Sequence, residues 1–136
     1  MSGRLANKVA IITGAGVGMG RASVLRFLEE GARVAALDIN GETLAETRRR
    51  GEAVSPHLWC RQVDITDEAA VRQAVAEVVE RFGTVDVLFN NAGVNHAALL
   101  HETTLEDWER VFSVNVRGMF LMCKHVLPVM MAHRAG

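Results

Sequence analysis

The chain has 136 residues with a formal net charge of −1 at pH 7, and 49% of its residues are hydrophobic. This length and composition suit one globular domain with its own core. The charge balance does not favour nucleic acid or a membrane as a partner, and no run of about 20 apolar residues predicts a membrane span. Residues 1–8 lack the apolar core of a signal peptide, and two cysteines without CxxC spacing indicate a reduced, cytoplasmic protein.

An apolar run that breaks into a glycine-rich turn begins the folded part of the chain. Residues 9–12 predict a short strand buried on both faces. Four glycines follow and let the backbone turn tightly: Gly14, Gly16, Gly18 and Gly20. Residues 21–30 then predict a helix. This order presents free backbone N–H groups and the positive end of a helix to an anion, typically a pyrophosphate.

The next segments alternate between strands and helices. Strands are predicted over residues 33–37, 58–63 and 85–89, with helices after the first two, the second of them over residues 67–82. Gly31 and Gly83 are predicted to end helices, whereas Asn40 and Thr66 are predicted to cap them. The basic run at residues 48–50 is interpreted as a solvated helix end, with phosphate binding as the less favoured alternative.

This alternation predicts an α/β fold with a parallel sheet and right-handed crossovers. Ligands of open parallel sheets bind beyond the carboxyl ends of the strands. The glycine turn, Asp38, Asp64 and residues 90–93 all follow predicted strands. They therefore predict a ligand site more specifically than the glycine turn does alone.

Two aspartates in this group favour particular parts of a dinucleotide. Asp38 lies about 20 residues after the glycine turn, where a carboxylate accepts hydrogen bonds from ribose hydroxyls and repels a 2′-phosphate. Neither Val17 nor Ile39 offers a positive charge to such a phosphate, so NAD is predicted over NADP. Asp64 is placed to hold an adenine amino group, with Ile65 packed on the ring. Helix capping is the alternative for both aspartates.

The fourth strand and the last helix contribute asparagines. Asn90 and Asn91 are predicted to brace the glycine turn by side-chain hydrogen bonds, while Ala92 and Gly93 let a flat ring or a ribose approach the backbone. Asn115 is polar within an otherwise apolar helix, and a satisfied buried amide is its alternative role.

The last helix is predicted over residues 104–131, with Thr104 and Asp107 as a capping pair. Residues 111–131 are apolar on nearly every face, so we expect burial against the sheet on one side and against further chain or another subunit on the other. Pro128 is predicted to kink or end the helix.

The histidines and serines do not form a recognisable catalytic or metal set. His96 and His101 lie in loop sequence at a spacing that does not suit one helix face, so no metal site is predicted. A substrate-facing His96 is the less favoured alternative. Neither Ser23 nor Ser113 has the partner pattern of a nucleophile. No P-loop motif is present.

Together these residues resemble the short-chain dehydrogenase/reductase family. Residues 13–20 match its Thr-Gly-x-x-x-Gly-x-Gly loop, residues 64–65 its adenine-contacting pair, and residues 90–93 its Asn-Asn-Ala-Gly signature. Asp38 matches the acidic position of NAD-preferring members. Asn115 matches the asparagine of the Asn-Ser-Tyr-Lys tetrad, whose backbone carbonyl holds a water in a proton relay. The resemblance implies the following cofactor-binding residues: Gly14, Val17, Gly18, Met19, Asp38, Ile39, Asp64, Ile65, Asn90, Ala92 and Gly93.

The resemblance implies a Rossmann-type doubly wound parallel sheet of strand order 3-2-1-4, with residues 1–136 as an NAD-binding domain. The implied activity is hydride transfer between NAD(H) and a small alcohol or ketone. In that family a tyrosine of lowered pKa is the acid/base, a lysine lowers its pKa and a serine orients the carbonyl. This sequence contains no tyrosine, and neither Ser113 nor Lys124 stands in the matching place.

We therefore expect an N-terminal, cofactor-binding half, truncated after the fourth strand and the helix that follows it and inactive alone. A catalytically inactive NAD-binding module or partner subunit is the alternative. A flavodoxin-like signalling domain fits the alternation but leaves the glycine turn and Asp38 unexplained. The resemblance also implies a homodimer or tetramer. The open fourth strand and the apolar last helix predict that the isolated chain associates.

Overall fold

In the computed structural model, which describes residues 3–136, four parallel strands form one sheet of order β3-β2-β1-β4. The strands are β1 (Val9–Thr13), β2 (Arg33–Asp38), β3 (Leu58–Gln62) and β4 (Val87–Phe89). The predicted Rossmann-type fold and its strand order are confirmed. Residues 1 and 2, part of the segment predicted to lack a signal peptide, lie outside the described residues.

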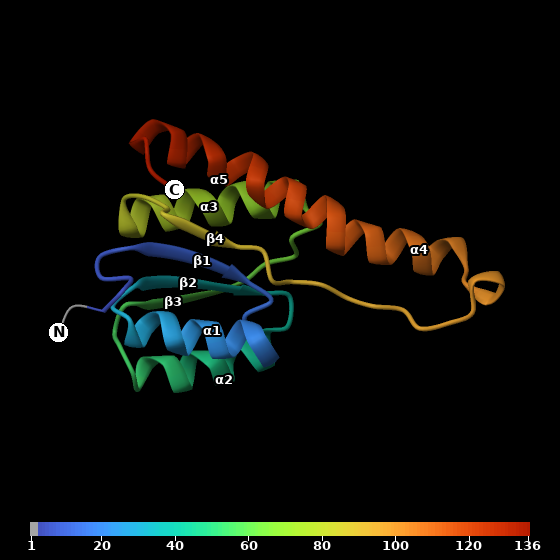
Figure 1. Cartoon of the computed structure of the whole chain (residues 1–136), viewed down its shortest axis with the longest axis horizontal. Coiled ribbons are helices and arrows are strands. Elements are labelled where there is room, and N and C mark those ends of the chain that lie inside the picture. The colour runs from blue at the N-terminus through green and yellow to red at the C-terminus, as the bar shows by residue number, and fades with distance from the viewer. Residues whose placement is uncertain (1–2) are drawn as a thin grey trace.

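Helices cover both faces of the sheet. Helices α1 (Gly18–Glu29) and α2 (Gly41–Glu52) cover one face, whereas α3 (Glu68–Phe82) and α5 (Met119–His133) cover the other (Figure 1). Helix α4 (Leu105–Phe112) continues the line of α5 and projects beyond the sheet (Figure 1). The long segment after β4 runs out along this projection and reaches α4 through a short 3₁₀ turn, Leu100–Glu102.

Neighbouring residues of the central strands belong to different layers. Ile11 packs with Val71 and Leu121 on the α3–α5 side, whereas Ile12 packs with Val24 on the α1–α2 side. Both isoleucines are 0% exposed. The predicted strand buried on both faces is confirmed, and its fully covered position explains why it lacks polar alternation.

The N-cap residue predicted from the sequence is confirmed for α2 but is wrong for α3. Asn40 accepts two backbone N–H groups and caps α2 as predicted. The cap of α3 is Asp67, whose Oδ1 accepts the N–H of Ala70 at 3.2 Å. The predicted cap, Thr66, is instead engaged by Asp64, which accepts its N–H at 2.9 Å and its hydroxyl at 2.7 Å. This side-chain turn at Asp64 moves the start of the helix by one residue.

The last helix differs from the single helix predicted over residues 104–131. Thr104 and Asp107 form the expected capping pair, but a π-helical segment, Ser113–Gly118, separates α4 from α5. Pro128 lies inside α5, which continues to His133, so Pro128 does not end the helix. Its missing N–H removes one helical bond, while the buried Val126 keeps this part of α5 on the sheet.

The outer edge of β4 is unpaired within the described chain, as predicted. Among residues 3–136, no helix is both long enough and apolar enough to span a membrane.

Candidate functional site

A groove of about 440 Å³ lies at the carboxyl ends of the strands. Its lining residues are Gly14, Val17, Gly18, Met19, Leu37, Asp38, Ile39, Val63, Asp64, Ile65, Asn91, Ala92, Gly93, Val94 and Val114. Of the twelve residues predicted for the site, ten line the groove, and Asn90 and Asn115 do not. The groove brings the predicted residues together because parallel strands end at the same edge of the sheet.

The glycine turn between β1 and α1 uses its glycines for different reasons. Gly14 and Gly18 have φ values of 62° and 55°, a conformation that side chains disfavour. A Cβ at Gly14 would also lie 2.8 Å from the Cα of Ala92, where the two loops meet. A Cβ at Gly18 would meet no described atom within 4 Å. Glycine is therefore required at position 14 by both packing and backbone conformation. At position 18, on the open wall of the groove, it is required by backbone conformation alone.

The N-terminus of α1 differs from those of α2, α3 and α4. Its N-cap, Val17, provides no side-chain hydrogen bond in the described chain, whereas Asn40, Asp67 and Thr104 cap α2, α3 and α4. The first N–H groups of a helix have no partner inside it. Residues 17–19 line the groove, so the positive end of α1 is available to an anion there.

Two residues that the sequence did not single out hold the glycine turn: Arg21 on α1 and Thr47 on α2. The guanidinium of Arg21 donates to the carbonyl of Gly16, to that of Thr43 at 3.1 Å and to the hydroxyl of Thr47 at 3.0 Å. Thr47 is 0% exposed and donates to the carbonyl of Ala15 at 2.8 Å. The sequence feature that could have identified Thr47 is its position on the apolar stripe of α2, because a buried hydroxyl needs a hydrogen-bond partner.

Asp38 stands on the groove wall with each carboxylate oxygen held by one backbone N–H. Oδ2 accepts from Gly16 and Oδ1 from Asn40, both at 2.8 Å. The carboxylate thereby ties the glycine turn to the start of α2. Asn40, not Asp38, caps that helix, so the capping alternative for Asp38 is wrong. Ile39 and Val17 beside it are 63% and 55% exposed and carry no charge.

Asp64 and Ile65 form the wall on the β3 side of the groove. Asp64 is exposed, and its Oδ1 engages Thr66. Because Asp67 caps α3, the capping alternative for Asp64 is also wrong. Ile65 is only 7% exposed and joins the core on the α3–α5 side of the sheet.

Asn91 braces the glycine turn as predicted. Its side-chain amide donates to the carbonyls of Thr13 and Gly14, both at 3.2 Å. The hydroxyl of Thr13 accepts the N–H groups of Asn91 and Ala92 at 3.1 Å. The end of β4 is therefore locked to the end of β1.

Asn90 does not brace the turn, and that prediction is wrong. Its Nδ2 lies 3.4 Å from Sγ of Cys123 on α5, while its Oδ1 is buried without a partner among the described residues. Successive side chains at the end of a strand point to opposite faces, so only Asn91 faces the glycine turn.

Asn115 lies in the π-helical segment and clamps the chain after β4. Its Oδ1 accepts the N–H of Val94 at 2.8 Å, and its Nδ2 donates to the carbonyl of Val94 at 2.7 Å. The side-chain amide is therefore satisfied, as in the alternative role, and the part of the backbone carbonyl in a proton relay stays a prediction. Its side chain is fully engaged in positioning Val94, a groove residue.

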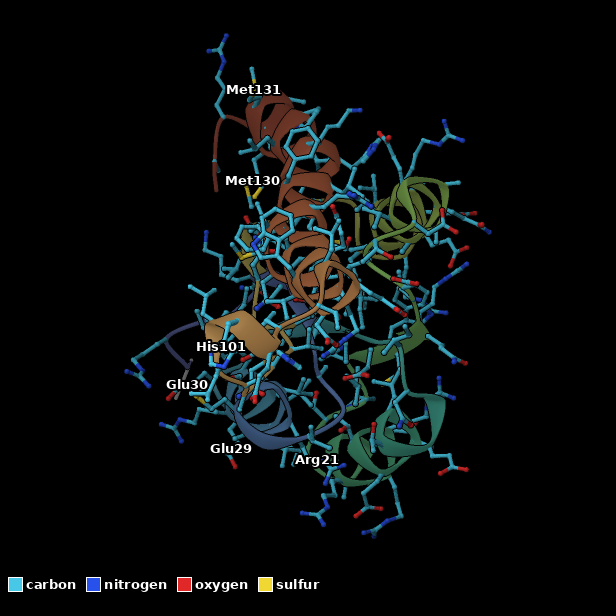
Figure 2. The ribbon with its side chains drawn as sticks, turned by 90° about the vertical axis from the view of Figure 1, so that its right-hand side faces the viewer. Arg21, Glu29, Glu30, His101, Met130 and Met131 are labelled. Atoms are coloured by element: carbon cyan, nitrogen blue, oxygen red, sulfur yellow. The ribbon has the colours of Figure 1, made fainter. Side chains whose placement is uncertain are left out.

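The remaining polar candidates lie outside the groove. His96 Nδ1 is 3.7 Å from Asp107 Oδ1 near the start of α4. The hydroxyl of Thr104, with a smaller contribution from His96, lowers the pKa of Asp107. His101 lies on the 3₁₀ turn (Figure 2). Within residues 3–136, no three His, Cys, Asp or Glu side chains gather to hold a metal ion.

The basic run at residues 48–50 lies near the end of α2, as interpreted from the sequence. Arg49 and Arg50 pair with Glu46 at 2.8 and 2.6 Å, which lowers the pKa of Glu46 to about 2, mainly through the hydrogen bond from Arg49. Arg48 donates to the carbonyl of Cys60 at 3.0 Å. These contacts leave the phosphate-binding alternative without support.

Known proteins with similar sequences include short-chain dehydrogenases and reductases. A family profile described as short chain dehydrogenase matches residues 8–136. The chain is 46% identical over 134 residues to 2-(R)-hydroxypropyl-CoM dehydrogenase of Xanthobacter autotrophicus, covering 96% of this chain and 54% of that protein. It is 39% identical over 133 residues to a 3-oxoacyl-[acyl-carrier-protein] reductase of Thermotoga maritima, covering 98% of this chain and 54% of that protein.

Solved structures of proteins with related sequences also superpose closely on the chain. The crystal structure of NAD⁺-bound xylitol dehydrogenase superposes with a TM-score of 0.94 at 36% identity, covering 98% of this chain and 52% of that chain. A short chain dehydrogenase/reductase from Burkholderia phymatum in complex with NAD superposes with a TM-score of 0.93 at 33% identity, covering 97% of this chain and 47% of that chain. The chain thus spans about half the length of the relatives it matches.

Proposed function

The chain belongs to the short-chain dehydrogenase family of oxidoreductases, and from this premise we propose that its groove binds a nicotinamide dinucleotide, with NAD preferred over NADP. NAD-bound structural relatives support a nicotinamide cofactor for the family. The observation that carries the preference for NAD is the fixed carboxylate of Asp38 on the groove wall.

Asp38 is fitted to a ribose rather than to a phosphate. Each carboxylate oxygen has about two lone-pair sites, and the backbone N–H groups of Gly16 and Asn40 use one site on each oxygen. The other sites remain for ribose hydroxyls. A 2′-phosphate would bring a second negative charge beside this carboxylate. No lysine or arginine belongs to the described groove lining, and Arg21 is engaged by the carbonyl of Gly16.

The rest of the groove fits the other parts of a dinucleotide. The uncapped end of α1 at residues 17–19 suits the pyrophosphate, because donors and helix dipole point into the groove. Asp64 and Ile65 are assigned to the adenine. Ala92 and Gly93 are assigned to the nicotinamide side, where small residues allow close approach of a ribose or ring. Asn90 does not line the groove, and we assign it the role of holding this loop against α5 through its contact with Cys123.

For the intact protein we assign reversible hydride transfer between NAD(H) and a small alcohol or ketone. When bound, the nicotinamide supplies the hydride acceptor or donor. The groove residues are assigned to bind and orient that group. The side chain of Asn115 positions Val94, and we assign its backbone carbonyl to the proton relay. The sequence contains no tyrosine, so residues 1–136 alone are expected to bind NAD without turning over an alcohol.

We also propose that the protein is cytoplasmic and that the intact protein forms a homo-oligomer. The thiols of Cys60 and Cys123 are free, as in proteins of the reducing cytoplasm. Side chains on the α4–α5 line are exposed although they are apolar: Leu105, Trp108, Phe112, Val116, Met119, Phe120, Leu127 and Met131. Such a surface supports a homo-oligomer for the intact protein.

The experiment that tests the proposed function is a comparison of NAD and NADP binding to the wild-type chain and to D38N by titration calorimetry. The substitution keeps the shape of the side chain but removes its charge. We expect D38N to lower the ratio of NAD to NADP affinity about tenfold, because the repulsion of a 2′-phosphate is lost. D67N is the matched control, since asparagine caps a helix as well as aspartate does. An unchanged ratio in D38N would contradict the proposal.

A further inference from the structure

The π-helical segment Ser113–Gly118 meets the groove wall at three places. Val114 lines the groove directly, and Asn115 is bonded to Val94, which also lines it. The third place is at the end of the segment, where the buried Gly118 lies against the side chain of Ile65. The first two contacts lie toward the loop after β4, whereas the third lies on the side of Asp64.

The contact with Ile65 leaves no room for a side chain at position 118. A Cβ there would lie 2.5 Å from Cδ1 and 2.7 Å from Cγ1 of Ile65. Carbon atoms in contact are normally about 3.5–4.0 Å apart. Gly118 has no positive φ that would demand glycine. The close approach of Ile65 is therefore the reason for glycine at this position.

Ile65 has little freedom to move away from such a side chain. It is 7% exposed and packs in the core cluster that contains Val71, Ala74 and Leu121. Its β-branched side chain is stiff at χ1, and close-packed cores resist added volume. The groove is the open space next to Ile65, so relief of a clash at position 118 is directed into the groove.

We propose that Gly118 is a positioning residue for the adenine end of the groove. Its missing side chain lets the helix receive Ile65, which keeps the space beside Asp64 open for the ring. The inference rests on the proposed function, because it assumes that adenine occupies this space. Gly118 acts only through Ile65 and does not itself line the groove.

The test is the affinity of the chain for ADP-ribose, which carries the adenine end without the nicotinamide. We expect G118A to weaken binding about tenfold. An I65A background removes the two atoms that would clash with the new methyl group, Cδ1 and Cγ1, and leaves the Cβ of residue 65 at 3.5 Å. There the same glycine substitution is expected to change the affinity by less than about twofold.

G51A is the matched control. A Cβ at Gly51, also buried in a helix, would lie 2.3 Å from Cδ2 of Leu58, which lies in the other layer and outside the groove. We expect G51A to lower the melting temperature but to keep ADP-ribose affinity within about twofold of wild type. Three results would overturn the inference: unchanged affinity in G118A, an equal loss in G51A, or a full loss in G118A on the I65A background.

Two further measurements distinguish a failure of this inference from a failure of the proposed function. If the wild-type chain binds neither NAD nor ADP-ribose, the proposed function fails. The methyl resonance of Ile65 Cδ1 still reports the contact, and we expect an NOE to the Hα protons of Gly118 and a shift of that resonance in G118A. Absence of both overturns the inference. If G118A alone does not fold, the I65A/G118A variant is expected to fold, and its failure to fold counts against the role of Ile65.

Discussion

The groove and the helical arm formed by α4, the π-helical segment and α5 leave different kinds of surface open. At the groove, most side-chain polar groups are paired with backbone, as in the contacts of Asp38 and Asn91, and the uncapped end of α1 stays open. On the arm, large apolar side chains are exposed, with Trp108 at 47% and Phe120 at 61%. Open donors favour a small charged ligand, whereas exposed apolar area favours another protein surface.

The two regions also differ in how rigidly they are built. The groove is cross-linked by hydrogen bonds between residues far apart in sequence, including Thr13 with Asn91 and Thr47 with Ala15. The projecting part of the arm is stabilised mainly by local contacts, such as the stacked rings of Trp108 and Phe112 at 4.1 Å. We therefore expect single substitutions in the groove to change ligand affinity and those on the arm to change association.

The largest effect is expected from G14A. Position 14 has a positive φ, and a Cβ there would collide with the backbone of Ala92, which cannot move without displacing the end of β4. We expect NAD affinity, measured by calorimetry, to fall about 100-fold or more. G83A is the control, because Gly83 also has a positive φ but lies away from the groove. A G14A variant that binds within a few-fold of wild type would show that the turn tolerates a side chain.

The next effect concerns the arm. Phe120 is 61% exposed on α5, and we expect the wild-type chain to associate at tens of micromolar, an order of magnitude typical of exposed apolar surfaces. F120K is expected to raise the dissociation constant at least about tenfold, measured by light scattering across a dilution series. V54K places the same charge at an exposed valine after α2 and is expected to leave association unchanged. A monomeric wild-type chain would contradict this part of the account.

A smaller effect is expected from T47V, which keeps the shape of a buried side chain but removes its hydroxyl. The carbonyl of Ala15 loses its donor at 2.8 Å, and Arg21 loses an acceptor at 3.0 Å. We expect the free energy of unfolding to fall by about 1–3 kcal/mol and NAD affinity to fall a few-fold. Chemical denaturation and calorimetry measure the two quantities. T43V is the comparison, because Arg21 uses only the backbone carbonyl of that residue.

The smallest effect is the pH dependence contributed by Glu46. Hydrogen bonds from Arg49 and Arg50 lower its pKa from 4.5 to about 2 in the folded chain. A carboxyl whose pKa is lowered on folding adds stability above its unfolded pKa, and this contribution is lost as the pH falls toward 2. Between pH 7 and pH 2, we expect the melting temperatures of wild type and E46Q to converge. A difference that stays constant over this range would rule out the ion pairs as its cause.

Sequence reasoning succeeded where the signals were local. The apolar run at residues 9–12, the glycines after it and the asparagine cap of α2 each act within a few residues, so they could be read directly. The gathering of Asp38 and Asp64 at one groove followed from a general property of parallel sheets.

Sequence reasoning failed where a distant partner decides. The π-helical interruption coincides with Asn115, whose side chain binds Val94 of another segment. The partner of Asn90 is Cys123 on α5, and the contacts of Arg21 with Thr43 and Thr47 depend on the approach of α2 to the glycine turn. One local prediction also failed: α3 is capped one residue later than predicted, because Thr66 and Asp67 are both good caps and Asp64, two residues before Thr66, engages the first of them.

The most direct measurement of the central claim is calorimetric titration of the wild-type 136-residue chain with NAD and, separately, with NADP. The account expects saturable one-to-one binding of NAD, with an affinity at least about tenfold higher than that for NADP. Equal affinities, a preference for NADP, or no binding of either nucleotide by a folded chain would contradict it.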